Sequence, residues 1–376
     1  MQNEYSYERY QRQTILKNFG DAGQLKLTQA KVLVVGAGGL GCPALLYLAA
    51  AGVGIIGVVD DDVVELDNLH RQPVYITQDI GKSKATTAAA YLKLLNPDIS
   101  IIPYIIRLMS ANSPEIVREY DIIIDATDNF SSRYMINDLC VLLDKPLVFG
   151  AVSQYEGQLA VFNVRQNEEE KTVHYRDLFP EPPNAGEVLS CAEAGVLGVV
   201  PGIIGTMQAA EAIKLITGIG QPLVNKLYTF NVLNNQSYEL ELQKKEGSDA
   251  LVPPTLETFR QTDYDWLCEK TNNPFEISID QFVTMLDYDN IEIIDVREPD
   301  EMPDVFDFGY KKIPLSKLKE NINRYEKEIV VFFCQSGQRS TKAAQWLQER
   351  SGNYKSIYSL QGGILNYLKQ RQEQKL

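Results

Sequence analysis

The chain has 376 residues, of which 44% are hydrophobic and 23% are charged. This length and composition can supply the cores of two or three domains, so the chain is neither disordered nor a small disulfide-stapled module. Its 36 Lys and Arg residues face 50 Asp and Glu residues, which gives a net charge of −14. Residues 276–376 contain 14 basic and 16 acidic side chains, so −12 of this charge lies in the first 275 residues. An acidic balance disfavours direct binding to nucleic acid or to an anionic membrane, because both need a cationic surface.

Five cysteines are spread along the chain without any Cys-x-x-Cys pair. An odd number of widely spaced cysteines predicts neither a disulfide framework nor a zinc site built from neighbouring residues. The first 13 residues are polar and lack the apolar run of a signal peptide. We therefore expect a reducing, cytoplasmic location.

An uncharged stretch of 28 residues, 32–59, is long enough to cross a membrane. It contains seven glycines and Pro43, which argue against a single lipid-facing helix. It divides instead into a strand at Lys31–Val35, a helix of small residues at 42–51 and a strand at Ile55–Val59. Apolar strands joined through a helix predict a parallel sheet covered on both faces, and no membrane span.

A glycine-rich loop, GAGGLG, lies between the first strand and the helix, and its glycines are Gly36, Gly38, Gly39 and Gly41. Glycines here allow a tight turn and a close approach of the backbone to a ligand, while the helix N-terminus offers free N–H groups to phosphate oxygens. Asp60 ends the second strand, where it can accept a ribose hydroxyl. The pattern alone suits several nucleotides, most often NAD or FAD, and it also occurs in plain tight turns.

Alternating strands and helices continue this architecture. Strands are predicted at Ser100–Tyr104, 121–125, 146–149, 157–164, 226–232 and 237–242, with helices at 83–95, 131–143 and 201–216. The polar stretch 165–190 predicts a long mobile loop, and the weakly patterned stretch 244–274 predicts a linker. We expect a doubly wound α/β domain over 1–245, a linker over 246–275 and a smaller α/β domain over 276–376.

Three polar residues downstream suit a triphosphate better than a dinucleotide. Arg71 and Lys84 can offset phosphate charge, and Asp128 can hold Mg²⁺. Taken singly, the two cations could be solvated surface charges, and Asp128 could be a helix N-cap. An NAD-dependent oxidoreductase explains the glycine loop and Asp60 but leaves these three residues without a role. Together, and in this order, they favour ATP.

With these motifs, the chain over about 7–242 resembles the MoeB/ThiF family, relatives of the ubiquitin-activating enzymes. The motifs that carry the resemblance are RYQRQ at 9–13, VVGAGGLG at 34–41, LDNLHRQ at 66–72, DATDN at 125–129 and SCAEAG at 190–195. The resemblance implies that the glycine loop and Asp60 hold an adenine nucleotide. It further implies phosphate-binding roles for Asn68, Arg71 and Lys84, and a Mg²⁺-binding role for Asp128. The counterpart of Arg12 reaches into a neighbouring subunit's ATP site, which implies a homodimer.

The family adenylates the C-terminal glycine carboxylate of a small ubiquitin-like sulfur carrier and expels pyrophosphate. Because that nucleophile is already ionised at pH 7, positioning and cationic stabilisation account for most of the catalysis. Cys191 is a further candidate, since in members fused to a sulfurtransferase the matching cysteine bonds covalently to the carrier. Its plainer interpretation is a small buried core residue.

Many relatives also hold a structural zinc ion through two Cys-x-x-Cys pairs. In this chain the first position reads His174-Tyr-Arg-Asp177, and the second, at 244–250, has no cysteine. Two side chains are too few for a structural tetrahedral site. We therefore expect no structural zinc.

Near the C-terminus, an apolar strand at Ile329–Phe333 runs into CQSGQRS, and a helix is predicted at 341–350. A thiol between a strand end and a helix N-terminus lies among N–H donors that favour the thiolate, and Arg339 adds a positive charge. Cys334 is therefore a candidate nucleophile, although an inert buried cysteine is the plainer alternative. Persulfide transfer and phosphate-ester cleavage both use a loop of this shape.

This region resembles a rhodanese domain, with DVRE at 295–298 and LQGG at 360–363 as further signatures. Four residues separate Cys334 from Arg339, whereas related phosphatases have five, so the shorter loop favours sulfur. The usual Gly-His-Ile-x-Gly-Ala stretch of the family is degraded here at 309–314. The match is weaker at that point, but the active loop is intact.

The two regions together predict adenylation of a carrier that ends in Gly-Gly, followed by persulfide transfer that leaves a C-terminal thiocarboxylate. The expected catalytic residues are Arg71, Lys84, Asp128, Cys191, Cys334 and Arg339. The resemblance implies a cysteine desulfurase as sulfur donor, and carriers of molybdopterin, thiamine-thiazole and tRNA-thiolation pathways all suit the scheme. The alternative is an enzyme that activates a ubiquitin-like protein for conjugation to lysines, with the rhodanese region as a docking module.

Overall fold

The computed structural model describes residues 4–165, 172–182, 194–264, 275–299, 301–302, 307–321, 327–335, 337–350 and 356–373. The chain forms two compact units. The first comprises Met1–Pro183 and Glu187–Glu269, and the second comprises Asn184–Gly186 and Lys270–Leu376. Each unit has its own sheet and its own core.

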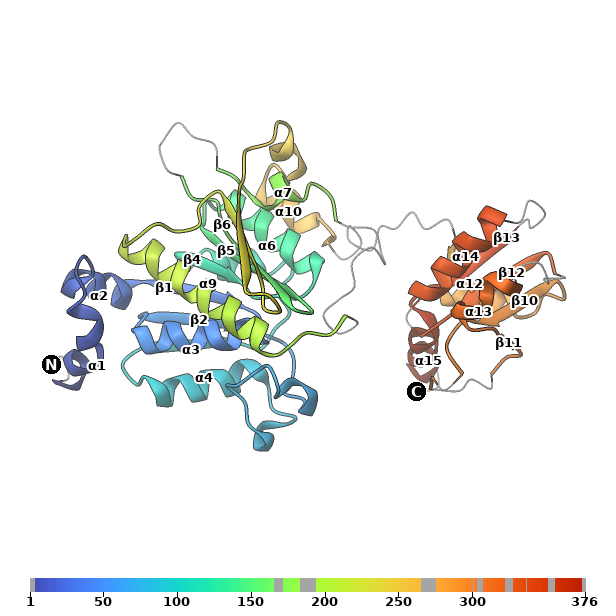
Figure 1. Ribbon diagram of the computed structural model, residues 1–376, viewed down its shortest axis with the longest axis horizontal. Coiled ribbons are helices and arrows are strands. Elements are labelled where there is room, and N and C mark those ends of the chain that lie inside the picture. The colour runs from blue at the N-terminus through green and yellow to red at the C-terminus, as the bar shows by residue number, and fades with distance from the viewer. Residues whose placement is uncertain are drawn as a thin grey trace. The chain divides into compact units, whose positions relative to one another are not determined.

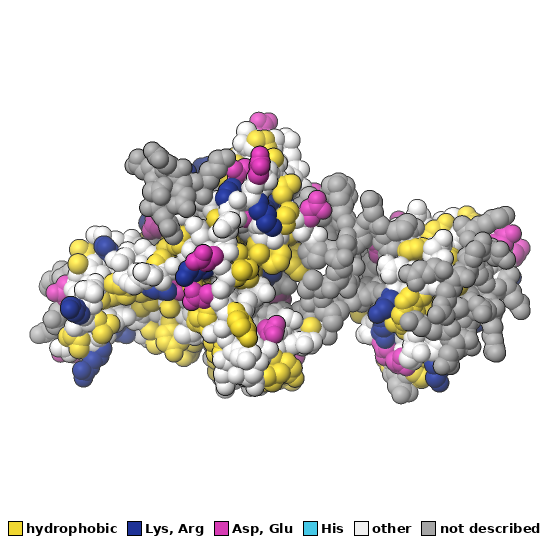
Figure 2. Space-filling model, turned by 45° about the horizontal axis from the view of Figure 1, so that its top comes forward, with side chains coloured by type: hydrophobic (Ala, Val, Ile, Leu, Met, Phe, Trp, Pro, Cys, Tyr) yellow, Lys and Arg dark blue, Asp and Glu magenta, His cyan; other side chains and the backbone are white. Residues whose placement is uncertain are grey.

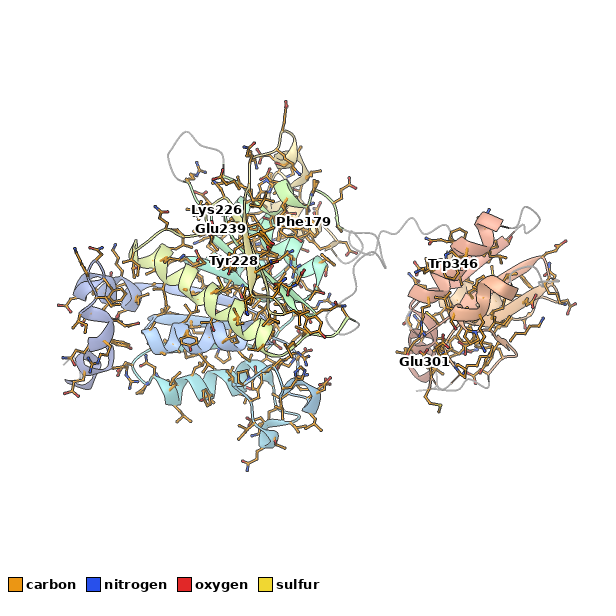
Figure 3. All side chains as sticks on the ribbon, viewed as in Figure 1. Phe179, Lys226, Tyr228, Glu239, Glu301 and Trp346 are labelled. Atoms are coloured by element: carbon orange, nitrogen blue, oxygen red, sulfur yellow. The ribbon has the colours of Figure 1, made fainter. Side chains whose placement is uncertain are left out.

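An eight-stranded sheet forms the centre of the first unit, with the order β3-β2-β1-β4-β5-β6-β7-β8. The strands are β1 (Lys31–Val35), β2 (Ile55–Val59), β3 (Ser100–Tyr104), β4 (Ile122–Asp125), β5 (Leu147–Ser153), β6 (Glu156–Phe162), β7 (Lys226–Asn231) and β8 (Gln236–Glu241). β3 to β5 pair in parallel, and β6 to β8 add an antiparallel extension. On that extension Lys226 of β7 pairs with Glu239 of β8 at 3.0 Å (Figure 3). The predicted doubly wound α/β fold is confirmed.

Helices cover both faces of this sheet (Figure 1). On one face lie α2 (Gly20–Gln29), α3 (Gly41–Ala51), α4 (Lys84–Leu95) and α9 (Val199–Thr217); on the other lie α5 (Ser113–Val117), α6 (Phe130–Leu142), α7 (Tyr175–Leu178) and α10 (Leu256–Gln261). α1 (Glu4–Thr14) packs on α2, and η1 (Leu66–Asn68), η2 (Thr77–Asp79) and η3 (Ser248–Leu251) are short 3₁₀ turns. Val32 and Val34 of β1 enter one core while Leu33 and Val35 enter the other, so successive side chains fill opposite faces.

Helix α9 is long and apolar enough to cross a membrane by length and composition. It packs against α3, β5 and β6, with Val200, Ile204 and Ala212 fully buried. A helix between another helix and a sheet needs apolar residues around most of its surface. These contacts account for its composition.

Two stretches without a clear sequence pattern contain packed structure in the first unit. α7 lies within the stretch predicted as a mobile loop, and its Tyr175 is buried. η3 and α10 lie within the stretch predicted as a linker, where Phe259 and Tyr264 are buried in the core beneath α6. The aromatic side chains anchor these short turns, although neither stretch has a long apolar period.

The second unit is built on a five-stranded parallel sheet with the order β11-β10-β12-β13-β9. Its elements are β9 (Glu276–Ile277), α12 (Ile279–Met285), β10 (Ile291–Asp295), β11 (Lys311–Lys312), α13 (Leu315–Asn321), β12 (Ile329–Phe333), α14 (Gln338–Arg350), β13 (Ser356–Leu360) and α15 (Gly363–Glu373). Val330 and Phe332 enter one core while Val331 and Phe333 enter the other. The central strand β12 therefore delivers the chain to Cys334 from a fully buried position.

Candidate active sites

A cleft of about 830 Å³ opens in the first unit at the carboxyl ends of β1, β2 and β4. Its walls come from the glycine loop, from the segment after β2, from the turns after β3 and β4, and from the start of α9. The strand order reverses between β1 and β4, and ligands of doubly wound sheets bind at such a switch point. The cleft is large enough for a nucleotide.

Two positions of the loop require glycine. Gly36 has φ of +96°, and a Cβ there would lie 2.7 Å from the carbonyl oxygen of Ala126. A Cβ on Gly41 would lie 1.9 Å from the carbonyl oxygen of Gly36, so α3 can start this close to the loop only with glycine. By contrast, the nearest atom to a Cβ on Gly38 would be the side chain of Gln72 at 3.7 Å. Gly38 and Gly39 line the cleft, where their backbone can approach a phosphate.

The carboxylate of Asp60 is held by the backbone of the glycine loop and of the segment that follows β2. One oxygen accepts the N–H of Ala37 at 2.8 Å, and the other accepts the N–H of Asp62 at 2.9 Å. Burial raises the pKa of Asp60, and these two hydrogen bonds oppose the shift. Each oxygen retains a second lone pair, which is what a ribose hydroxyl requires.

The predicted phosphate-binding cations both line this cleft. The side chain of Lys84 is only 8% exposed, and its Nζ lies 3.0 Å from Asp62 Oδ2. Arg71 Nη1 donates to the carbonyl oxygen of Asp67 at 2.8 Å and contacts His70 Nε2 at 2.8 Å. Within the described ranges Arg71 forms no ion pair, so its charge is available to an anionic ligand.

Asn68 is buried and fixes the turn that carries Arg71. Its Oδ1 accepts the N–H of Glu65 at 3.2 Å, and its Nδ2 donates to Asp67 Oδ1 at 2.8 Å. The structure therefore shows it as a support for the turn within the cleft wall.

Asp128 is exposed to the cleft between β4 and α6. The N-cap of α6 is Asn129, whose side chain accepts the N–H of Ser132 at 2.9 Å, so the alternative interpretation of Asp128 as a helix cap is wrong. The described lining residues include more carboxylates than cations. The carboxylates are Asp60, Asp61, Asp62, Glu65, Asp67 and Asp128, and the cations are Arg71, Lys84 and Arg107. A triphosphate bound among these groups would need further positive charge, and Asp128 offers the hard oxygen ligand that could hold a divalent cation.

Gln72 was not among the residues predicted for the site. It is 3% exposed, it lines the cleft beside Gly38, and its Oε1 has no hydrogen-bond partner in the described part of the chain. A buried carbonyl oxygen without a partner is costly unless a ligand or water satisfies it. Gln72 is the last residue of the LDNLHRQ motif, which is the sequence feature that could have identified it as a site residue.

One predicted residue of the first unit is not brought to the cleft, and another lies outside the described residues. Arg12 is exposed on α1 and is not among the residues that line the cleft. Cys191 lies outside the described residues, although Gly195, four positions later, lines the cleft.

The second site is the loop after β12, where the sulfur of Cys334 is almost fully buried. It accepts the N–H of Gly337 at 3.2 Å and lies 3.6 Å from the hydroxyl of Ser340. Donors aimed at sulfur stabilise a thiolate or a persulfide anion. Gly337 has φ of +97°, which a side chain would strain and which turns its N–H toward the sulfur.

Arg339 projects from the first turn of α14 and is held by Glu301, which is labelled in Figure 3. Its Nη2 donates to Glu301 Oε2 at 2.6 Å, and its Nη1 donates to Glu301 Oε1. Glu301 raises the pKa of Arg339, and Cys334 adds to this. The same fork lowers the pKa of Glu301 to about 2. Both groups are therefore charged at neutral pH.

The other described cysteines are unsuited to thiolate chemistry. Burial raises the pKa of Cys42 to about 12 and also raises that of Cys140. Cys42 donates to the carbonyl oxygen of Ala37 at 3.3 Å and acts as a small core residue. Cys334 differs from these two thiols in lying at a strand end in a loop before a helix, with the N–H of Gly337 and the hydroxyl of Ser340 directed at its sulfur.

His174 and Asp177, where the sequence predicts no zinc, are both buried and contact the more exposed side chains of Lys244 and Asp249. Lys244 Nζ lies 3.2 Å from Asp177 Oδ2 and 2.6 Å from Asp249 Oδ1, and His174 Nε2 lies 3.3 Å from the same Asp249 oxygen. An ammonium group already occupies the space between the two carboxylates. A metal ion does not fit this arrangement, because Lys244 would oppose its charge.

Comparison with known proteins finds a matching family for each of the two units. Residues 10–250 match the ThiF family, and residues 278–370 match the rhodanese-like domain. The "Sulfur carrier protein adenylyltransferase" of Thermus thermophilus is 51% identical over 237 residues, which cover 63% of this chain and 88% of that protein. The "Probable adenylyltransferase/sulfurtransferase MoeZ" of Mycobacterium tuberculosis is 38% identical over 375 residues, which cover 97% of this chain and 93% of that protein.

A solved structure of Escherichia coli MccB with ATP aligns with 66% of this chain and 75% of that chain, at a TM-score of 0.54 and 23% identity. This likeness shows a shared fold. The family matches, together with the glycine loop, the cleft and the Cys334 loop, agree with the resemblance noted in the sequence. The chain belongs to the ThiF family and carries a rhodanese-like domain behind its ThiF region.

Proposed function

We propose that this protein adenylates the C-terminal carboxylate of a small sulfur-carrier protein with ATP and then transfers sulfur to it, leaving a thiocarboxylate. The observation that carries the proposal is that one chain holds both a nucleotide cleft and a cysteine whose sulfur faces hydrogen-bond donors. The relatives named as adenylyltransferases and sulfurtransferases support it, because one of them is matched over 97% of this chain.

In the first step a carrier carboxylate oxygen attacks the α-phosphorus of ATP, the bond to pyrophosphate breaks, and an acyl-adenylate forms. The reaction brings anions together, so cations that are fixed beforehand lower its barrier. Lys84 is held by Asp62 and Arg71 by the turn around Asn68, so both meet the phosphates without reorganisation. Asp60 and the glycine loop orient the nucleotide.

The proposal includes Mg²⁺, held by Asp128 together with phosphate oxygens. An exposed carboxylate in a cleft with an excess of acidic side chains is a suitable oxygen ligand. When bound, the ion would offset phosphate charge. The proposal includes no structural zinc, since Lys244 lies among the side chains that would have to bind it.

In the second step the terminal sulfur of a Cys334 persulfide attacks the acyl carbon and releases AMP. The product is an acyl disulfide on Cys334. We assign its cleavage to the thiolate of Cys191, which would form a disulfide with Cys334 and release the thiocarboxylate. A dithiol reductant would then restore both cysteines.

The sulfur donor in this scheme is a cysteine desulfurase, and the setting is a reducing cytoplasm in which thiols stay free. We further propose a homodimer. Arg12 is exposed on α1 and does not line the cleft of its own chain, so a partner cleft would give it a role.

ATP–pyrophosphate exchange tests the first step. The purified chain is assayed with a panel of carriers that end in Gly-Gly, each paired with a matched form lacking the two terminal glycines. Exchange that needs an intact carrier terminus supports the proposal. Exchange with none of the carriers, or equal exchange with the truncated forms, would refute it.

Thiocarboxylate formation separates the proposal from the conjugation alternative. A conjugation enzyme with a rhodanese docking module would transfer the activated carrier to lysines and would not need Cys334. Cys334→Ser should therefore retain pyrophosphate exchange but lose thiocarboxylate. Normal thiocarboxylate yield in this variant would contradict the sulfurtransferase step.

A further inference from the structure

Glu301 is the feature of the second unit that the proposed function leaves unexplained. Its carboxylate makes a two-pronged contact with Arg339, the cation of the Cys334 loop. The backbone N–H of Glu298 donates to Glu301 Oε1 at 2.9 Å, so a local turn fixes the carboxylate in place. The side chain of Glu301 is 25% exposed and that of Arg339 is 34% exposed, so the pair lies at the rim of the loop.

The second arginine of this region is also neutralised. Arg297 is fully buried and its Nη2 lies 2.8 Å from Asp295 Oδ2. Within the described residues each of these two arginines therefore has its own carboxylate. The ammonium of Lys312, on the edge strand β11, donates to the carbonyl oxygen of Pro299 at 2.9 Å. Each guanidinium charge is offset by a carboxylate charge, so the two arginine–carboxylate pairs add no net charge to the Cys334 loop.

This balance matters because sulfur donors differ in the charge of their leaving group. The Cys334 thiolate attacks the sulfane sulfur of the donor, and a new S–S bond forms as the donor bond breaks. The leaving group keeps the electron pair of the broken bond, so no external oxidant or reductant is needed. Thiosulfate leaves as the dianion sulfite, whereas a persulfide leaves as a single thiolate. A dianion needs a free cation beside the sulfur, and a thiolate does not.

We propose that Glu301 sets the donor preference of Cys334, because by pairing with Arg339 it favours a persulfide carried on a thiol over a doubly charged oxyanion donor. This inference rests on the proposed sulfurtransferase function and adds to it the residue that selects between chemical classes of donor. Glu301 is a positioning residue in this account, since it acts through Arg339.

The test compares sulfur loading of Cys334 in the full-length chain, with thiosulfate and with 2-hydroxyethyl persulfide as donors. The variants are Glu301→Gln, which removes the charge and keeps the shape, and Glu301→Asp, which keeps the charge. Glu298→Gln is the matched control, because it removes an exposed carboxylate from the same turn. Loading is followed by intact mass as a gain of about 32 Da, the mass of one sulfur atom, over a range of donor concentrations.

We expect Glu301→Gln to raise the second-order loading rate with thiosulfate about tenfold, the scale of one unit charge acting on a nearby dianion in water. The higher rate should result from a lower half-saturating concentration of thiosulfate, and the difference from the wild type should become smaller at high salt. Loading by the persulfide should change less than about twofold, within the weak effect expected for a single rim charge. Glu301→Asp and Glu298→Gln should both behave like the wild type.

Three results would overturn the inference. They are an unchanged thiosulfate rate in Glu301→Gln, a parallel fall with both donors, and an equal gain in Glu298→Gln. Failure of the proposed function gives a different result, in which wild-type Cys334 accepts sulfur from neither donor. Normal persulfide loading in the wild type with no effect of Glu301→Gln refutes the role of Glu301 alone.

Discussion

Replacing Lys84 with methionine should slow adenylation strongly while leaving the fold intact. The ammonium of Lys84 is buried at the wall of the nucleotide cleft and is held 3.0 Å from Asp62 Oδ2. Methionine has an unbranched apolar side chain of similar length, so it fills the space of the lysine stem without carrying the charge. The change therefore isolates the electrostatic contribution of this one group.

The size of the effect follows from the position of the charge. A preorganised cation at developing negative charge is typically worth about 10²- to 10³-fold in rate, or about 2.7–4 kcal/mol. The effect on stability should be smaller, because the Asp62 side chain is 70% exposed and such ion pairs contribute at most about 1 kcal/mol. In a domain of this size that corresponds to a shift in Tm of about 2–4 °C.

The assay is ATP–pyrophosphate exchange at saturating carrier, with thermal unfolding measured on the same samples. Lys82→Met is the matched control, since Lys82 precedes Lys84 by two residues, is 59% exposed and pairs with Asp79 at 2.8 Å. We expect Lys82→Met to exchange at the wild-type rate. Exchange by Lys84→Met within about threefold of wild type, far below the loss expected for a preorganised cation, would refute the assigned role. An equal loss in Lys82→Met would refute it as well.

Three further predictions concern other parts of the first unit. Asp128→Asn should lower exchange by about 10²-fold with no change in Tm, because the side chain is exposed to the cleft; normal exchange would remove its assigned role. Asp138→Asn should lower the free energy of unfolding by about 3–5 kcal/mol, measured by urea denaturation, because it strands the buried guanidinium of Arg176 that Asp138 holds through two bonds of 2.7 Å. Burial lowers the pKa of His174 in the folded chain, so the unfolded chain binds a proton at this residue more readily than the folded chain does. Protonation therefore favours the unfolded chain, and the folded chain loses stability as the pH falls below the unfolded pKa of about 6.5. Tm should fall less steeply from pH 7 to pH 5 in His174→Gln than in the wild type or in His70→Gln, the exposed control, and parallel curves would contradict this sign.

Most of the scaffold was predictable from sequence because its signals are local. β1, β2 and β3 have the predicted bounds, since each is a short run of mostly apolar residues. The glycine loop was recognisable because Gly36 and Gly41 sit where backbone contacts admit no side chain. Arg71, Lys84 and Asp128 converge on one cleft because the carboxyl ends of parallel strands share an edge.

The pairings between distant segments were not predictable. Asp138 of α6 binds Arg176 of α7 and the hydroxyl of Tyr264, two residues that lie 38 and 126 positions away in the chain. Glu301 and Arg339 are likewise 38 residues apart. Such contacts depend on how elements pack and leave no periodic trace in the sequence. The same reason explains why α7 and α10 went unrecognised, since each is short and is held by buried aromatic side chains.

The central claim is that one chain carries out both adenylation and sulfur transfer, and the mass of the carrier tests it most directly. The purified chain is incubated with ATP, Mg²⁺, a Gly-Gly carrier, a persulfide donor and a dithiol reductant. Replacement of the terminal carboxylate oxygen by sulfur should add about 16 Da to the carrier with the wild type, and nothing with Lys84→Met or Cys334→Ser. A carrier that never gains this mass, or that gains it equally with Cys334→Ser, would contradict the account.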